Sequence, residues 1–287
     1  MDTDNLFSLL PLTFYPLLPD KISELRMRVG KPLYCFDGGK WFFVREGDKP
    51  YVVTGGDVAH VLGRASGYSL YSVTDNLVKG FITWKGGIRI GVTGECVSDG
   101  GAVFNVKYPT SLAIRIPCEI KGQADELIGK IVEGRKFRNT MIVSPPAGGK
   151  TTLLREIARA ASVKGLNVAV IDERSEIAAV CKGEPTLDTG PSCDVITGVS
   201  KTRAFEMLVR SMNPDAVITD EIYGEKEVNA VLDAIRAGVG VAISVHAETV
   251  GALKDTVYEK LQKAMDVTVV LSKKKRPGEI AEIIEKC

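Results

Sequence analysis

The chain has 287 residues, of which 45% are hydrophobic and 25% are charged, with 37 basic and 36 acidic side chains. This composition excludes a disordered or fibrous chain, and the length allows one large domain or two. A formal net charge of +1 gives no overall electrostatic reason to expect nucleic acid or an anionic membrane as the main partner. The six cysteines are scattered and only two histidines accompany them, which favours reduced thiols over a zinc site.

The most apolar segment of the chain covers residues 6–20, "LFSLLPLTFYPLLPD". It is short, is interrupted by prolines and follows an acidic "MDTD", so we expect neither a signal peptide nor a spanning helix. We expect the segment to pack against its own domain; docking onto a membrane protein is the alternative.

Residues 1–120 are predicted to form a small α+β domain. Short strand-like runs alternate there with helical stretches such as residues 57–71. The strand-like runs cover residues 32–37, 41–46, 51–56, 87–97 and 111–117.

Residues 121–287 follow a different pattern and are predicted to form an α/β domain. Residues 121–139 are expected to be a polar helix that leads into this domain. Continuous apolar runs then recur between helical or irregular segments, as is typical of parallel strands buried on both faces. The runs cover residues 140–144, 167–172, 215–221, 240–246 and 267–272. After the last run we expect a basic turn, "KKKR" at residues 273–276, and a closing strand or short helix.

The strongest motif is "SPPAGGKTT", which follows the first of these apolar runs and precedes an amphipathic helix. A glycine-rich turn between a strand and a helix, followed by Lys and Thr, is typical of a phosphate-binding loop. The lysine would reach the β and γ phosphates, and the first threonine would bind magnesium. The motif therefore predicts binding of ATP with Mg²⁺ by residues Ser144, Pro145, Pro146, Ala147, Gly148, Gly149, Lys150, Thr151 and Thr152. Ser144 departs from the common pattern, which has glycine at this position, although the two prolines restrict φ there.

A second motif, "DAVITDEI", supplies two adjacent carboxylates at the end of an apolar run, as in a Walker B strand. Asp220 is expected to stabilise magnesium, and Glu221 to orient or deprotonate the attacking water. Two further strands are expected to end at the same edge of the sheet. One brings the acidic sequence "VIDERSE", with Asp172 and Glu173, and the other brings His246.

Together these motifs resemble the secretion ATPase superfamily, in which a Walker A loop, an Asp box, a Walker B strand and a His box follow in this order. The resemblance implies a RecA-like P-loop ATPase domain with a mostly parallel sheet, preceded by the smaller α+β domain. It implies catalytic roles for Glu221, Glu173, Lys150 and His246, and magnesium contacts for Thr151, Asp220 and Asp172. Which acid of the Asp box contacts magnesium and which contacts water stays open. The His box reads "SVHAE", without the threonines that many members carry on either side of the histidine.

Arginines from a neighbouring subunit commonly complete the site in such ring-shaped ATPases. Arg210 in "LVRSMNPDAVITDEI" matches the arginine that precedes the Pro-Asp of the family. Arg89, Arg115 and Arg203 are further candidates.

The closer resemblance is to the stage III sporulation AA proteins of endospore-forming bacteria. It extends over nearly the whole chain and is carried by "ELRMRVGKPL", "GFITWKGGIRIGVTGECV", "SPPAGGKTTLLREIAR", "DERSEI" and "RSMNPDAVITDEI". It implies a homo-oligomeric ATPase, a hexamer, in the mother-cell cytoplasm. The ATPase would be peripheral to the inner face of the membrane and would dock onto membrane proteins of a channel between mother cell and forespore.

Two other functions are compatible with the sequence. A RecA-like nucleic-acid-remodelling ATPase shares the same core, but the charge balance speaks against nucleic acid as a partner. A nucleotide-binding scaffold with little hydrolysis is the other alternative, and the presence of Glu221 argues against it.

Overall fold

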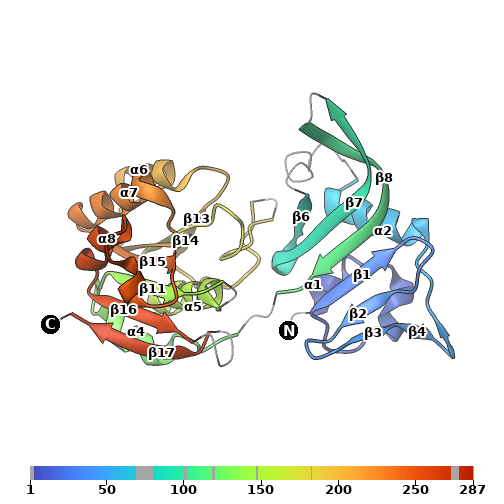
Figure 1. Cartoon of the computed structure of the whole chain (residues 1–287), viewed down its shortest axis with the longest axis horizontal. Helices are drawn as coiled ribbons and strands as arrows, with labels where there is room; N and C mark the ends of the chain where they lie inside the picture. Colours follow the sequence, from blue (N-terminus) through green and yellow to red (C-terminus); the bar gives the residue numbers. More distant parts are fainter. Residues whose placement is uncertain are drawn as a thin grey trace. The chain divides into compact units, whose positions relative to one another are not determined.

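The computed structural model describes residues 3–68, 80–99, 102–117, 120–146, 148–181, 183–272 and 278–286. The chain divides into two compact units, each with its own hydrophobic core (Figure 1). The first unit comprises Met1–Glu119 and Cys181–Thr186, and the second comprises Ile120–Val180 and Leu187–Cys287. The predicted boundary lies between residues 120 and 121, and Cys181–Thr186, which fall in the predicted second domain, group with the first unit.

The first unit is built on a six-stranded antiparallel sheet with the order β3-β2-β1-β8-β7-β6. Side chains alternate across the sheet, so that Leu25 and Met27 of β1 are buried while Arg28 is exposed. Its elements are α1 (Thr3–Phe7), η1 (Leu12–Leu17), β1 (Glu24–Arg28), β2 (Tyr34–Phe36), β3 (Trp41–Phe43), β4 (Arg45–Glu46), β5 (Lys49–Pro50), α2 (Gly55–Ser66), β6 (Phe81–Trp84), η3 (Lys85–Gly87), β7 (Ile88–Asp99) and β8 (Ala102–Arg115).

Helix α2 has clear start and stop signals. Thr54 and Asp57 form a reciprocal capping box at its start, and Gly67 adopts the left-handed conformation at its end. The helix therefore ends earlier than the expected range of residues 57–71, of which residues 69–71 lie outside the described part of the chain.

The apolar N-terminal segment packs on the first unit. Leu6, Leu9, Leu10 and Phe14 are buried in its core, whereas Leu12 is 77% exposed. No helix formed by the described residues combines the length and the apolar character that crossing a membrane requires.

The second unit is built on a seven-stranded sheet with the order β13-β12-β14-β15-β11-β16-β17. All neighbouring strands are parallel except β17, which pairs antiparallel with β16. The elements are α4 (Asp125–Ile131), β9 (Val132–Glu133), β10 (Lys136–Phe137), β11 (Thr140–Ser144), α5 (Lys150–Val163), β12 (Val168–Ile171), β13 (Cys193–Ile196), α6 (Lys201–Ser211), β14 (Ala216–Glu221), α7 (Gly224–Arg236), β15 (Gly240–His246), η4 (Val250–Leu253), α8 (Tyr258–Ala264), β16 (Val267–Leu271) and β17 (Ile280–Glu285).

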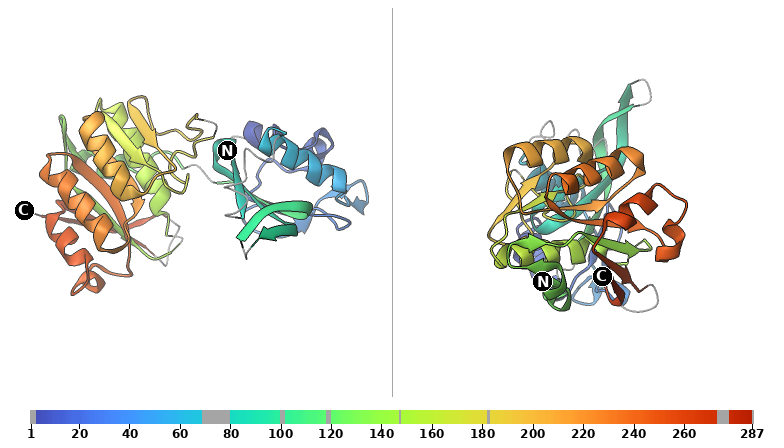
Figure 2. Two further views of the ribbon diagram at one scale, coloured as in Figure 1. Left: turned by 90° about the horizontal axis from the view of Figure 1, so that it is seen from above. Right: turned by 90° about the vertical axis from the view of Figure 1, so that its left-hand side faces the viewer.

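Helices cover both faces of this sheet, which explains the continuous apolar runs in the sequence (Figure 2). Helices α4 and α5 contribute to the core on one face, and α6, α7 and α8 contribute to the core on the other. Each of the five predicted apolar strands is present, as β11, β12, β14, β15 and β16. Strand β13 is not among the predicted strands; it is an edge strand and is only half-buried.

The expected helix over residues 121–139 was wrong in its second half. Helix α4 ends at Ile131, and the chain then forms the short β9–β10 hairpin. Gly134 adopts a φ of 58° in the turn of this hairpin, a conformation that glycine accepts readily and that ends helical propagation. The closing element of the chain is the strand β17, and the basic turn at residues 273–276 lies outside the described residues.

Candidate functional site

The predicted phosphate loop joins β11 to α5. β11 ends at Ser144, and α5 begins at Lys150 after Gly149, which has a φ of 89°. The first amides of a helix lack partners within the helix and lie at the positive end of its dipole, so they favour an anion. Thr151 and Thr152 belong to this first turn. Ala147 lies outside the described residues.

Ser144 fits the loop without the conformational freedom of glycine. It is the last residue of β11, is fully buried and pairs in register with His246 of β15. Its hydroxyl donates to the carbonyl of Pro145 at 3.0 Å. The requirement for glycine instead falls on Gly148, where a Cβ would lie 2.0 Å from the Ser144 oxygen.

Strand order brings the other predicted residues to the same edge of the sheet. β15 lies between β11 and β14, so His246 lies between the phosphate loop and the end of the Walker B strand. The ends of parallel strands at a crossover form the usual ligand-binding edge of an α/β sheet. The structure therefore brings Lys150, Glu221 and His246 together within the second unit.

A chain of polar contacts links these three side chains. Lys150 Nζ lies 3.2 Å from His246 Nδ1, and His246 Nε2 lies 3.2 Å from Glu221 Oε2. The lysine also donates to the carbonyls of Ser144 and Pro145, at 3.3 and 3.2 Å. Burial lowers the pKa of Lys150, while the carboxylates of Glu221 and Glu176 act in the opposite direction.

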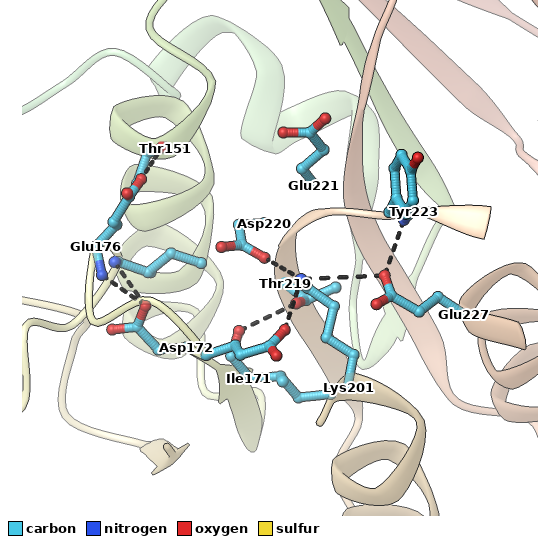
Figure 3. Close-up of polar contacts among 12 residues, drawn as sticks. Thr151, Ile171, Asp172, Glu176, Lys201, Thr219, Asp220, Glu221, Tyr223 and Glu227 are labelled. Carbon is cyan, nitrogen blue, oxygen red and sulfur yellow. Dashed lines mark hydrogen bonds and ion pairs between the residues drawn. The ribbon is translucent and has the colours of Figure 1, made fainter. Parts of the chain in front are cut away.

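The two adjacent Walker B carboxylates have different partners, and a β-bulge lies at this end of β14. The register between β14 and β15 shifts between Ile218 and Glu221, where β14 has one residue more than β15. Glu221 contacts His246, whereas Asp220 is buried and lies 2.9 Å from Lys201 Nζ (Figure 3). Burial raises the pKa of Asp220, although the Lys201 ammonium opposes this shift.

The Asp box loop after β12 is held by its own aspartate. Asp172 is fully buried, and its two carboxylate oxygens accept hydrogen bonds from four backbone amides at 2.7 to 3.2 Å. The four donors are the amides of Glu176, Ile177, Ala178 and Ala179. Because these oxygens already accept four backbone hydrogen bonds, Asp172 is the residue that shapes the loop.

We expect the Asp172→Ala variant to lose about 3 kcal/mol or more of unfolding free energy, because four amides in a buried loop would lose their acceptor. Denaturant unfolding of the full chain measures this loss. Asp194→Ala, at an exposed position of β13, is the control and should change stability by no more than about 0.5 kcal/mol. A loss below about 1 kcal/mol for Asp172→Ala would contradict the structural role of this carboxylate.

The other acids of the loop point to different partners. Glu176 Oε2 lies 3.5 Å from the hydroxyl of Thr151, and Glu173 Oε2 lies 3.1 Å from Lys201 Nζ. Arg155 of α5 holds the Asp box loop by donating hydrogen bonds to the carbonyls of Glu176 and Ile177 at 2.6 and 2.5 Å. The loop thus carries one carboxylate toward the phosphate loop and one toward α6.

Lys201 belongs to the site although its sequence motif does not predict it. It is the first residue of α6 and is only 4% exposed. Burial would lower its pKa, but the carboxylates of Asp220, Glu227 and Glu173 outweigh burial, and the net shift of the Lys201 pKa is upward. A lysine at the start of an amphipathic helix usually lies in solvent, so the sequence carried no signal for this position.

The candidate arginines lie on α6 and on two strands of the first unit, β7 and β8. Arg210 is in the last turn of α6, a helix of 11 residues, so it is roughly 14 Å along the axis from Lys201. It lines a groove between α6 and α7 with a volume of about 470 Å³. Arg203 pairs with Glu206 at 2.8 Å on the same helix. In the first unit, Arg89 lies over the ring of Phe81, and Arg115 lies 3.9 Å from Glu24.

Comparisons with known proteins show the family and the fold of the chain. The model of the family described as "Sporulation stage III, protein AA" matches residues 12–287. Stage III sporulation protein AA of Bacillus subtilis (strain 168) is 34% identical over 274 residues, which cover 93% of this chain and 87% of the relative. The chain belongs to the sporulation stage III protein AA family. The predicted family resemblance is thereby confirmed.

Solved structures of ATPases share the fold of this family member. The pilus retraction motor PilT with bound ADP matches with a TM-score of 0.57 and 16% identity, over 87% of this chain and 74% of that chain. The ATPase DotB of Legionella pneumophila matches with a TM-score of 0.55 and 14% identity, over 87% of this chain and 72% of that chain. These likenesses confirm the predicted α/β, RecA-like fold with a smaller N-terminal domain.

Proposed function

We propose that this protein is a Mg²⁺-dependent ATPase that works as an oligomer. The observation that carries the proposal is the convergence of Lys150, Glu221 and His246 at the carboxyl edge of the second sheet, directly beside the start of α5. A phosphate site and a carboxylate that can accept a proton from water are among the parts that phosphoryl transfer to water requires, and His246 links the two here. Relatives of known fold that are described as an ATPase and as a motor with bound ADP support the same conclusion.

The donors at this edge fit a magnesium ion shared with a nucleotide. The Thr151 hydroxyl and the carboxylates of Asp220 and Glu176 are oxygen donors, which magnesium prefers. Among the described residues, no group of three or more His, Cys, Asp or Glu side chains could hold a metal by itself. A magnesium ion here would therefore share its ligands between protein, water and phosphate oxygens, and would neutralise phosphate charge when bound.

Each residue of the site has a distinct role in the proposed reaction. Lys150 and the first amides of α5 bind the phosphates, and the tight turn at Gly148 lets the backbone approach them. Glu221 orients the attacking water and accepts its proton. His246 holds Glu221 at 3.2 Å and also faces Lys150, so it can relate the position of the carboxylate to the occupancy of the phosphate site.

In this proposal the Asp box residues position other groups of the site and do not take part in proton transfer. Asp172 shapes the loop, Glu176 faces Thr151 on the phosphate side, and Glu173 faces Lys201. Glu173, for which the family resemblance implies a catalytic role, would therefore act through Lys201.

The biological setting follows from the family. We propose a homo-oligomeric ring, a hexamer, in which Arg210 acts on the nucleotide of a neighbouring subunit, since it lies at the far end of α6 from Asp220. The ring would work in the mother-cell cytoplasm, peripheral to the inner face of the membrane. It would dock onto membrane proteins of a sporulation channel and use hydrolysis to drive its assembly or transport through it.

Phosphate release from ATP by the purified full chain tests this function. We expect release with Mg²⁺ and none above background with EDTA, and a rate per subunit that rises with protein concentration. Light scattering on the same samples gives the oligomeric state. If a sample that scatters as an oligomer shows no Mg²⁺-dependent phosphate release, the proposed activity is contradicted. A rate per subunit that stays constant as the protein concentration rises would contradict a site shared between subunits.

A further inference from the structure

The cluster around Lys201 joins three parts of the second unit. Lys201 Nζ lies 2.9 Å from Asp220 at the end of β14, 3.1 Å from Glu173 in the Asp box loop and 4.0 Å from Glu227 in α7. Glu227 also accepts the backbone amide of Tyr223 at 2.8 Å, immediately before α7 begins. One buried ammonium thus faces carboxylates from a strand, a loop and a helix.

Stability alone is a weak explanation for such a cluster. Burying an ammonium and a carboxylate costs desolvation, and well-packed apolar residues often replace buried ion pairs without loss. The side chains of Lys201 and Asp220 are only 5% and 8% exposed, so both bear this cost. Three carboxylates also face the Lys201 ammonium, and the positive charge of Arg174 acts on Asp220 as well.

The position of Asp220 suggests a functional reason for burying this ion pair despite its desolvation cost. In Figure 3, Asp220 lies between Lys201 on one side and Thr151 with Glu176 on the other. Oδ1 of Asp220 faces the ammonium. A carboxylate fixed by one oxygen keeps its direction toward a cation bound on the other side, as supporting contacts of metal ligands generally do.

We propose that Lys201 is a positioning residue that holds Asp220 and Glu173 in the arrangement that receives the magnesium ion of the nucleotide. This inference rests on the proposed binding of Mg²⁺ with ATP, and it adds a residue that acts through Asp220 without touching the substrate. Lys201 supplies a fixed positive charge, so the carboxylates stay close together before a metal binds. Loss of this charge weakens the contribution of magnesium to nucleotide binding and leaves the phosphate loop itself intact.

Equilibrium binding of a fluorescent ADP, titrated with Mg²⁺, separates these effects without measuring hydrolysis. We expect Lys201→Met to raise the Mg²⁺ concentration at half-maximal enhancement of binding by about tenfold or more. Binding of the same nucleotide in EDTA should stay within about twofold of the wild type. Lys201→Arg, which keeps the charge, should stay within about threefold of the wild-type Mg²⁺ midpoint, and the exposed control Lys260→Met should not differ from it.

The outcomes decide between positioning and a structural role. A Mg²⁺ midpoint for Lys201→Met within about twofold of the wild type would overturn the proposal, as would equal losses of binding in Mg²⁺ and in EDTA. If Lys201→Met does not fold, Lys201→Met/Glu227→Gln removes one charge of each sign and carries the same expectation. A wild-type protein whose nucleotide binding does not respond to Mg²⁺ would instead overturn the proposed function and this inference together.

Discussion

Lys150→Ala is expected to reduce ATP hydrolysis at least about 100-fold, because it removes the ammonium that stabilises charge on the phosphates at the start of α5. The same variant should bind nucleotide more weakly in both Mg²⁺ and EDTA, since the proposed contact of Lys150 with phosphate does not depend on a metal. Phosphate release and fluorescent-nucleotide binding measure the two effects on one preparation.

Lys164→Ala is the matched control for this experiment. Lys164 is exposed and lies at the C-terminal end of α5, whereas Lys150 begins this helix. Replacing Lys164 by alanine therefore changes the net charge as much as Lys150→Ala does but leaves the phosphate loop unchanged. Its activity should equal that of the wild type. A Lys150→Ala protein that is folded and hydrolyses ATP as fast as Lys164→Ala would exclude the phosphate loop as the site of the activity.

Glu221→Gln should reduce the rate of hydrolysis by about 10²–10⁴-fold, because the amide keeps the shape of the side chain but cannot accept a proton from water. Nucleotide binding in Mg²⁺ should persist, since Lys150 and the first turn of α5 are unchanged. Single-turnover phosphate release beside equilibrium nucleotide binding measures this separation of binding from chemistry.

Glu225→Gln, at an exposed position in the first turn of α7, is the control and should retain the wild-type rate. The pair of variants also distinguishes an ATPase from a nucleotide-binding scaffold. If the protein is a scaffold, the wild type and Glu221→Gln should release phosphate equally slowly. If it is an ATPase, Glu221→Gln should lose turnover and Glu225→Gln should keep it. Equal rates in all three proteins would therefore favour the scaffold.

Together with the binding test on Lys201, these variants assign separate effects to neighbouring residues. Loss of Lys150 should weaken binding with and without metal, loss of Glu221 should spare binding, and loss of Lys201 should weaken only the response to magnesium. The three patterns differ although the residues lie at one edge of the same sheet.

The sequence alone determined the features that depend on neighbours in the chain. Five continuous apolar runs predicted the buried parallel strands β11, β12, β14, β15 and β16, because strands covered on both faces have no polar side. The motif around Gly148 and Lys150 predicted a strand, a tight loop and a helix start, since each of these is encoded within a few residues. The order of the motifs predicted the family.

Only the tertiary structure decided which polar groups meet. The sequence placed Asp172 and Glu173 side by side as equivalent acids, but one faces four loop amides and the other faces Lys201. It gave no signal for Lys201 itself, because its burial depends on how α6 packs beside the ends of β12 and β14. It also could not place His246 between Lys150 and Glu221, because that contact depends on the insertion of β15 between β11 and β14. Local sequence encodes turns, periodicity and helix ends, whereas the pairing of buried charges depends on strand order and packing between segments far apart in the chain.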